Sequence, residues 1–249
     1  MSRDEVQLAP VGSAVVGAAG VAAIQASGGS TAIGSIAALA YLIVSTALLL
    51  RALHRRGARR FGWANVVTAT RSAMVGIITG LVAASFVEPV AVPLLMGLVV
   101  PALLLDAVDG WVARRTGSIT ELGARFDMEV DAFLLLVLSA YVAQVLGPWV
   151  LAIGLMRYAF VAAGWLVPRL RGQLPPRYWR KVVTAVQGIA LAVAASGLLP
   201  NLAGVLVGVA LALLVESFGR DVVWLARHGT SGSPAPSLRP AQPAEVEAS

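Results

Sequence analysis

Six apolar stretches, each close to the length of a membrane span, follow one another along most of the chain. They cover residues 65–86, 89–115, 126–147, 148–167, 182–198 and 201–224. A helix needs about 20 apolar residues to cross the hydrocarbon core, where only helices and closed barrels satisfy every backbone hydrogen bond. The chain is also 58% hydrophobic and 13% charged, whereas soluble domains carry about 25% charged residues. The sequence therefore predicts an all-α, polytopic membrane bundle with a six-helix core.

Lysine and arginine are distributed unevenly between the connections. Residues 51–60 hold five arginines, residues 114–125 hold three, and residues 169–181 hold four arginines and one lysine. The turns at 88–89, 147–148 and 197–201 hold neither residue type. Because positive residues favour the cytoplasmic side, we expect a multi-pass protein of the cell membrane with its charged connections in the cytoplasm. The net charge of +6 then serves orientation and anionic headgroups, and no nucleic acid partner is expected.

The segments outside the core are less regular. Residues 1–30 form an N-terminal segment whose Ala, Gly and Val-rich part, 11–27, fits a span, a surface helix or a disordered segment. Residues 31–53 are apolar enough to form an extra transmembrane helix, which precedes the six-helix core at 54–227. Residues 228–249 are rich in Gly, Ser, Pro and Ala, which predicts a disordered cytoplasmic tail.

Four of the six aspartates lie in one window between the second and third apolar stretches: Asp106, Asp109, Asp127 and Asp131. A charge within an apolar span costs about 2.5–3.5 kcal/mol, and neighbouring carboxylates repel one another. At about 100° per residue, each pair shares one helix face. Two adjacent helices can therefore point four carboxylates into one cleft near the cytoplasmic boundary. The alternative is a solvated acidic loop.

Carboxylate oxygens in this number suit Mg²⁺ or Mn²⁺, and two such ions can hold a diphosphate between them. Gly110 and Ala113 are small residues on the same face, and Gly123 is small on the other side, so a substrate can approach closely. Arg114 is placed to meet a phosphate. A thiolate site is excluded because the chain has no cysteine.

The window resembles the signature of the CDP-alcohol phosphatidyltransferases, D-x2-D-G-x2-A-R-x8-G-x3-D-x3-D, at every fixed position. The resemblance implies an enzyme of phospholipid biosynthesis that transfers a phosphatidyl group from CDP-diacylglycerol to an alcohol and releases CMP. It implies metal ligation by Asp106, Asp109, Asp127 and, in part, Asp131, which is also the expected general base. Gly110, Ala113, Arg114 and Gly123 are expected to line the CDP pocket. The family commonly forms homodimers, so a homodimer is expected here.

Asn65, Thr68 and Arg71 recur at every third residue where the first core stretch begins. They are similar to the family's P-N-x2-T-x2-R pattern, with Ala64 in place of the proline. Thr68 and Arg71 are expected to face the site and contact CDP, because a buried arginine in a span needs a partner. The alternative is local: Asn65 caps the helix and Thr68 bonds to its own backbone.

Two further cations, Arg157 and Lys181, are candidates for binding the acceptor alcohol. Arg157 lies well inside the fourth stretch, where it is expected to bind a phosphate of the acceptor; the alternative is a structural pair with a carboxylate such as Asp131. Lys181, Thr184 and Gln187 are similar to a K-x2-T-x2-Q stretch of glycerophosphate-accepting members. These cations favour glycerol 3-phosphate, with an inositol phosphate or another polar alcohol as alternatives. The chain thus resembles members that make phosphatidylglycerophosphate or phosphatidylinositol phosphate.

The non-enzyme alternative is a divalent-cation transporter that uses the aspartates as a pathway. Transport sites usually lie near the bilayer midplane and between structural repeats. In this chain the carboxylates are expected at one membrane surface, and no internal repeat is visible.

Overall fold

The structure is a computed structural model that describes residues 3–56, 63–116, 121–167 and 178–228. Within these ranges the chain forms helices and no strands. The elements are α1 (Arg3–Ala26), α2 (Ala32–Arg56), α3 (Trp63–Ala84), α4 (Val92–Thr116), α5 (Glu121–Leu146), the short 3-10 helix η1 (Pro148–Val150), α6 (Leu151–Leu166), α7 (Tyr178–Ser196) and α8 (Pro200–His228). The predicted all-α bundle is confirmed.

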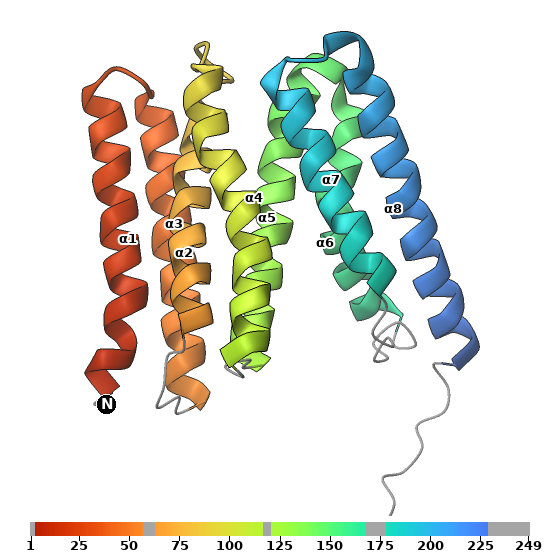
Figure 1. Ribbon diagram of the computed structural model, residues 1–249, viewed down its shortest axis with the longest axis horizontal. Helices are drawn as coiled ribbons and strands as arrows, with labels where there is room; N and C mark the ends of the chain where they lie inside the picture. The colour runs from red at the N-terminus through yellow and green to blue at the C-terminus, as the bar shows by residue number, and fades with distance from the viewer. Residues whose placement is uncertain (1–2, 57–62, 117–120, 168–177, 229–249) are drawn as a thin grey trace, which may run out of the picture.

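The α-helices run up and down, side by side (Figure 1). The starts of α1, α3, α5 and α7 and the ends of α2, α4, α6 and α8 lie at one end of the bundle. We call it the charged end, because basic residues such as Arg55, Lys181 and Arg227 lie there. By the distribution of basic residues, the charged end is the expected cytoplasmic end.

Five helical segments of the described part are long and apolar enough to cross a membrane: Ala32–Arg55, Val66–Ala84, Gly123–Leu146, Pro148–Leu166 and Pro200–Arg227. In α4 the apolar segment within the described side chains is Val92–Asp106. The first half of α7 carries Arg180, Lys181 and Gln187, which lowers its hydropathy.

The buried core is centred on α3. In the apolar window of α3, 61% of the residues are buried, compared with 22% for α2 and 17% for the segment that includes α6. The core side chains come mainly from α3, α4, α5 and α7, and the fully buried ones include Val75, Ile78, Leu95, Val99, Leu138 and Leu191. The central position of α3 places its polar residues between the other core helices.

The turn between α5 and α6 is tight and places the two helices in close contact. Gly147 has a φ of 99°, a left-handed conformation that glycine adopts without steric cost. Farther along, an added Cβ on Gly154 would lie only 2.4 Å from the Cα atom of Leu136. Glycine at this position lets α6 pack directly against the backbone of α5.

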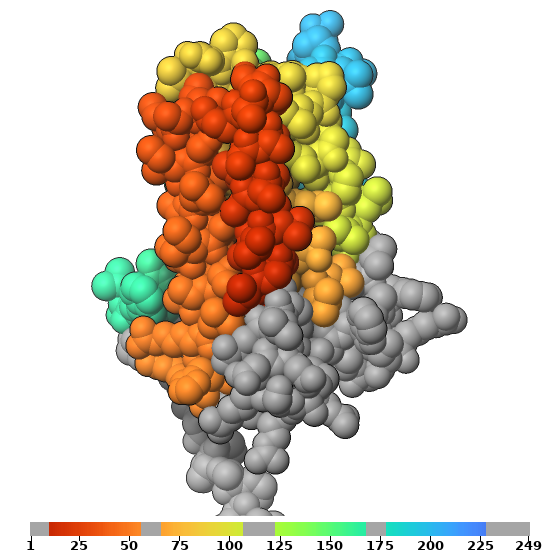
Figure 2. Space-filling model, turned by 90° about the vertical axis from the view of Figure 1, so that its left-hand side faces the viewer, coloured from red at the N-terminus to blue at the C-terminus, as the bar shows by residue number. Residues whose placement is uncertain are grey.

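The N-terminal hairpin, which consists of α1 and α2, packs against α3 at the edge of the bundle (Figures 1 and 2). Of the three alternatives for residues 11–27, the structure has a helix, and its apolar part is Pro10–Ala26. Whether this helix spans the bilayer stays a prediction, as do the boundaries drawn between the N-terminal segments, the core and the tail. Residues 229–249, which include nearly all of the expected tail, lie outside the described residues.

The start of the third core helix differs from the expected position. The sequence pattern predicts it near Phe126, but α5 begins at Glu121. Glu121 stands at the helix start, where an acidic residue interacts favourably with the helix dipole, so the helix begins before the apolar stretch. Asp127 and Asp131 consequently lie in the second and third turns of α5.

Candidate active site

One buried arginine contacts three aspartates and joins three helices. Arg71 of α3 has a completely buried side chain. Its Nη1 donates a hydrogen bond to Asp106 Oδ1 of α4 at 2.7 Å. Its Nη2 lies 2.9 Å from Asp131 Oδ1 of α5 and also donates to Asp127 Oδ1. A buried charge is tolerated when it is paired and hydrogen-bonded, so these contacts account for an arginine inside α3.

Helix geometry places Arg71, Asp106 and Asp131 at a similar depth. Arg71 follows the start of α3 at Trp63, and Asp131 follows the start of α5 at Glu121, each by two to three turns. Asp106 precedes the end of α4 at Thr116 by a similar length. At 1.5 Å per residue, these positions lie about 12–15 Å from the charged end. The expected convergence of carboxylates from two helices is thus observed for Asp106, Asp127 and Asp131.

The three carboxylates fit a divalent cation. Each offers one oxygen, and these oxygens lie within 4.8 Å of one another. Metal–oxygen bonds of about 2.0–2.6 Å place oxygens across a single ion about 4–5 Å apart. Carboxylate oxygens are also the ligand type that Mg²⁺ and Mn²⁺ prefer.

The aspartates are accessible, whereas the arginine is not. The side chain of Asp106 is 47% exposed, and those of Asp127 and Asp131 are 28% and 25% exposed. Arg71 therefore approaches the cluster from inside the bundle, and the opposite side is open to an ion and a substrate. A carboxylate has two oxygens and about four lone-pair positions, so a bond from Arg71 does not exhaust its capacity for a metal.

The remaining positions of the signature are only partly described. Asp109, Gly110, Ala113 and Arg114 belong to the helical backbone of α4, but their side chains lie outside the described residues. Gly123 lies in the first turn of α5 and is partly exposed. The metal-binding role of Asp109 and the CDP-binding roles of the other four stay predictions.

Thr68 and Arg71 both lie on the buried side of α3, with exposures of 4% and 0%. They are three residues apart, so both face the centre of the bundle. The sequence indicated that Arg71 needs a partner, but did not indicate that three aspartates would serve. Contact of Thr68 and Arg71 with CDP stays a prediction, and the side chain of Asn65 lies outside the described residues.

Arg157 has a carboxylate partner, but not Asp131. It donates from Nη2 to Oε1 of Glu129 on α5. Glu129 lies about 160–200° around the helix from the two aspartates beside it, and its side chain is 57% exposed. In this structure Arg157 therefore lies across α5 from the aspartate cluster. Its expected role in acceptor binding stays a prediction, and the Glu129 pair is a structural alternative with a named partner.

The start of α7 is joined to the end of α8. Arg180 lies 3.6 Å from Asp221, and Trp179 donates to Glu216 at 3.2 Å. Lys181 is exposed beside these pairs, and its acceptor-binding role also stays a prediction. Deeper in α7, Gln187 is 2% exposed, and its Nε2 has no hydrogen-bond partner among the described residues.

Comparison with known proteins shows which family the core helices match. A family model described as CDP-alcohol phosphatidyltransferase matches residues 61–216, well over half of the 249-residue chain. The match includes Arg71 and the whole aspartate window and leaves the N-terminal hairpin outside. The chain matches no curated protein and no solved structure.

Proposed function

The chain belongs to the CDP-alcohol phosphatidyltransferase family, and on this premise we propose that it transfers the phosphatidyl group of CDP-diacylglycerol to glycerol 3-phosphate. Membership makes it a multi-pass membrane enzyme of phospholipid biosynthesis that transfers a substituted phosphate group from a CDP-linked substrate to an alcohol. The transporter alternative is thereby set aside. Three details are proposed: the lipid part is diacylglycerol, the acceptor is glycerol 3-phosphate, and the site faces the cytoplasm.

The cluster of Arg71 with Asp106, Asp127 and Asp131 is the observation that carries this proposal. The family is generally dependent on divalent metals, and these carboxylates have the ligand type and the spacing for one. We propose Mg²⁺ or Mn²⁺, with Asp109 as a further ligand and two ions in the working enzyme. When bound, the metal neutralises the diphosphate and makes its phosphorus more electrophilic.

Asp131 is the proposed general base. The acceptor hydroxyl attacks the phosphorus that carries diacylglycerol, the bond from this phosphorus to the CMP oxygen breaks, and the hydroxyl proton passes to Asp131. CMP leaves with the electron pair of the broken bond. Arg71 holds Asp131 Oδ1 at 2.9 Å, so it orients the base while it remains buried.

The choice of acceptor is supported by two cations, Lys181 near the charged end and Arg157 inside α6. Glycerol 3-phosphate is anionic, and cationic side chains such as the exposed Lys181 and the partly exposed Arg157 are suited to bind its phosphate. An inositol phosphate is attracted by the same charges and is the alternative acceptor, followed by other polar alcohols. A homodimer is proposed from the family resemblance, and cross-linking of the protein in native membranes tests it.

A CMP-release assay tests the proposed reaction. Purified protein in nanodiscs is given CDP-diacylglycerol, Mg²⁺ or Mn²⁺, and in separate reactions glycerol 3-phosphate, an inositol phosphate or serine. We expect CMP release that requires both metal and acceptor, is fastest with glycerol 3-phosphate, and stops with excess EDTA. Absence of CMP release with every acceptor would overturn transfer from CDP-diacylglycerol, whereas faster release with another alcohol would change the acceptor alone.

A further inference from the structure

A tyrosine outside the matched family region reaches two of the three helices that carry the site. Tyr41 of α2 has its hydroxyl 3.2 Å from Ser72 Oγ on α3. Its ring stacks on Phe133 of α5 with ring centroids 4.7 Å apart. Ser72 directly follows Arg71, and Phe133 lies two residues after Asp131. The Tyr41 side chain is also within electrostatic range of Arg71 and Asp131.

A second contact of α2 lies nearer the charged end. Leu49 and Leu53 are both 5% exposed and pack against Phe126, the residue before Asp127. Phe126 and Phe133 are seven residues apart and therefore lie on nearly the same face of α5. α2 thus contacts α5 at two points, one beside Asp127 and one near Asp131.

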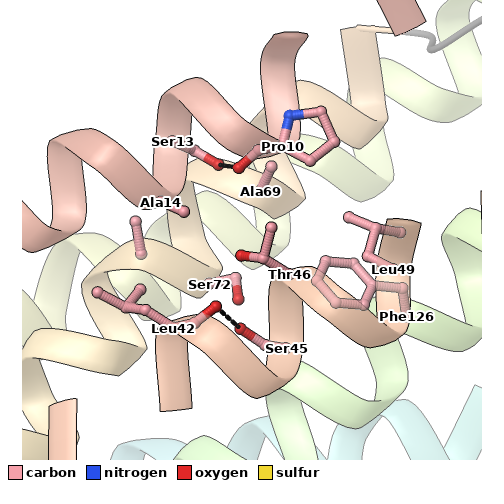
Figure 3. Close-up of a pocket in the computed structure, with 11 residues that line it drawn as sticks. Pro10, Ser13, Ala14, Leu42, Ser45, Thr46, Leu49, Ala69, Ser72 and Phe126 are labelled. Carbon is pink, nitrogen blue, oxygen red and sulfur yellow. Dashed lines mark hydrogen bonds between the residues drawn. The ribbon is translucent and has the colours of Figure 1, made fainter. Parts of the chain in front are cut away.

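The surface between these helices is visible in Figure 3, where Leu49 of α2 lies beside Phe126 of α5. Ser72 and Ala69 of α3 line the same small pocket, together with Leu42 of α2 and residues of α1. Ser72, next to Arg71 in sequence, and Phe126, next to Asp127, therefore face the N-terminal hairpin.

Close helix contacts fix α2 against α3. A Cβ added to Gly80 of α3 would lie 2.7 Å from the carbonyl oxygen of Gly34 on α2. A Cβ added to Gly76 would lie 2.7 Å from a Leu42 methyl group. With backbones this close, α2 has little room to move along or around α3, so the position of Tyr41 is well determined.

We propose that Tyr41 is a positioning residue for the phosphatidyl transfer: it holds α3 and α5 at the spacing at which Arg71 reaches Asp127 and Asp131. The inference rests on the proposed function and adds the N-terminal hairpin to the residues that determine the site. N–H···O hydrogen bonds have donor–acceptor distances of about 2.7–3.2 Å, so a shift of α3 relative to α5 separates Arg71 from its carboxylates. Tyr41 acts through these residues and does not touch the substrate.

A double-mutant cycle tests the proposal. Tyr41→Phe keeps the stacked ring and removes the hydroxyl, Ser72→Ala removes the same hydrogen bond from α3, and the double variant removes both groups. For each protein we measure kcat/KM for CMP release, Mn²⁺ affinity by electron paramagnetic resonance, and Tm. One hydrogen bond contributes about 0.5–1.5 kcal/mol, so each single change is expected to lower kcat/KM and Mn²⁺ affinity about two- to tenfold. The double variant is expected to lose no more than either single variant.

Tyr141→Phe is the matched control. Tyr141 lies on α5 and packs against the core, and among the described residues its hydroxyl has no hydrogen-bond partner. It is expected to retain wild-type kinetics and Mn²⁺ affinity.

Two results overturn the proposal. A lower Tm of Tyr41→Phe with unchanged Mn²⁺ affinity and unchanged kcat/KM would make Tyr41 a purely structural residue. Additive losses in the cycle would show that Tyr41 and Ser72 do not act through one shared bond. Mn²⁺ affinity is measured without turnover, so a failure of the positioning role is distinguishable from a failure of the proposed reaction.

Discussion

Arg71 on α3 and Asp131 on α5 form an ion pair with Nη2 and Oδ1 2.9 Å apart. The same guanidinium also contacts Asp106 and Asp127. The arginine therefore serves two purposes: it offsets one of the three negative charges, and it orients the carboxylate that we propose as the base. Both purposes are open to direct measurement.

Asp131→Asn is expected to abolish CMP release while the protein still folds. The amide has nearly the same shape and retains an oxygen for Arg71, but it does not accept the hydroxyl proton. General-base catalysis contributes about 10²- to 10⁴-fold, so kcat is expected to fall by at least about 10²-fold with Tm near wild type. Glu88→Gln, at the end of the bundle opposite the charged end, is the control for a carboxylate-to-amide change. Retention of activity in Asp131→Asn would rule out this base.

Arg71→Gln is expected to lower Tm and to make Tm more sensitive to Mn²⁺. Removing the cation leaves three clustered carboxylates with no offsetting positive charge from position 71, so they repel one another more strongly. A divalent ion then relieves a larger repulsion, and it stabilises the folded protein to which it binds. Thermal unfolding with and without Mn²⁺ measures this difference between the variant and the wild type. An equal Mn²⁺-induced shift in both proteins would contradict the role of Arg71 as a counter-charge.

Gly80→Ala is expected to destabilise the protein, whereas Gly97→Ala is not. The new methyl group at position 80 meets the Gly34 carbonyl oxygen at 2.7 Å, whereas nothing lies within 4 Å of the Cβ position at Gly97. Overpacking costs about 1–3 kcal/mol, while alanine in a helix interior is favoured over glycine by about 0.5–1 kcal/mol. Thermal unfolding in one detergent is therefore expected to give Tm shifts of opposite sign. A stabilising Gly80→Ala change would show that the hairpin is not held by this contact.

Arg157→Gln is expected to raise the KM for glycerol 3-phosphate about tenfold or more, because a charge-assisted contact contributes about 1.5–3 kcal/mol. Mn²⁺ affinity is expected to remain unchanged, since Arg157 contacts Glu129 across α5 from the aspartate cluster. Glu129→Gln removes the same ion pair without removing the arginine. If both variants lower Tm alike and leave KM unchanged, the pair is structural and Arg157 does not bind the acceptor.

The helix starts illustrate how far local sequence information extends. Apolar length located α5 but not its first turn, because the charged residues Glu121 and Arg125 lower the hydropathy before Phe126. Charge at the helix start favours such a turn, but hydropathy alone does not detect it. The depth of Asp106 and Asp131 was predictable, since depth depends on residue number along a helix.

The sequence did not specify the partners of the buried cations. Arg71 was expected to need a partner, and Arg157 was expected to meet a phosphate or a carboxylate such as Asp131. The structure has Arg71 with three aspartates and Arg157 with Glu129. Those pairings depend on which helices are neighbours and how each is rotated about its axis. Hydropathy and charge along the chain do not specify either quantity.

By itself, the sequence determined the helical core, the charged end, the aspartate window and the family resemblance. These features depend on composition, short-range periodicity and fixed spacing within one or two helices. Only the tertiary structure decided that Arg71 joins the carboxylates and that Tyr41 of the N-terminal hairpin contacts both α3 and α5. The physical reason is packing: close contacts such as Gly34 with Gly80 set the rotation and spacing of whole helices, and these determine which distant side chains meet.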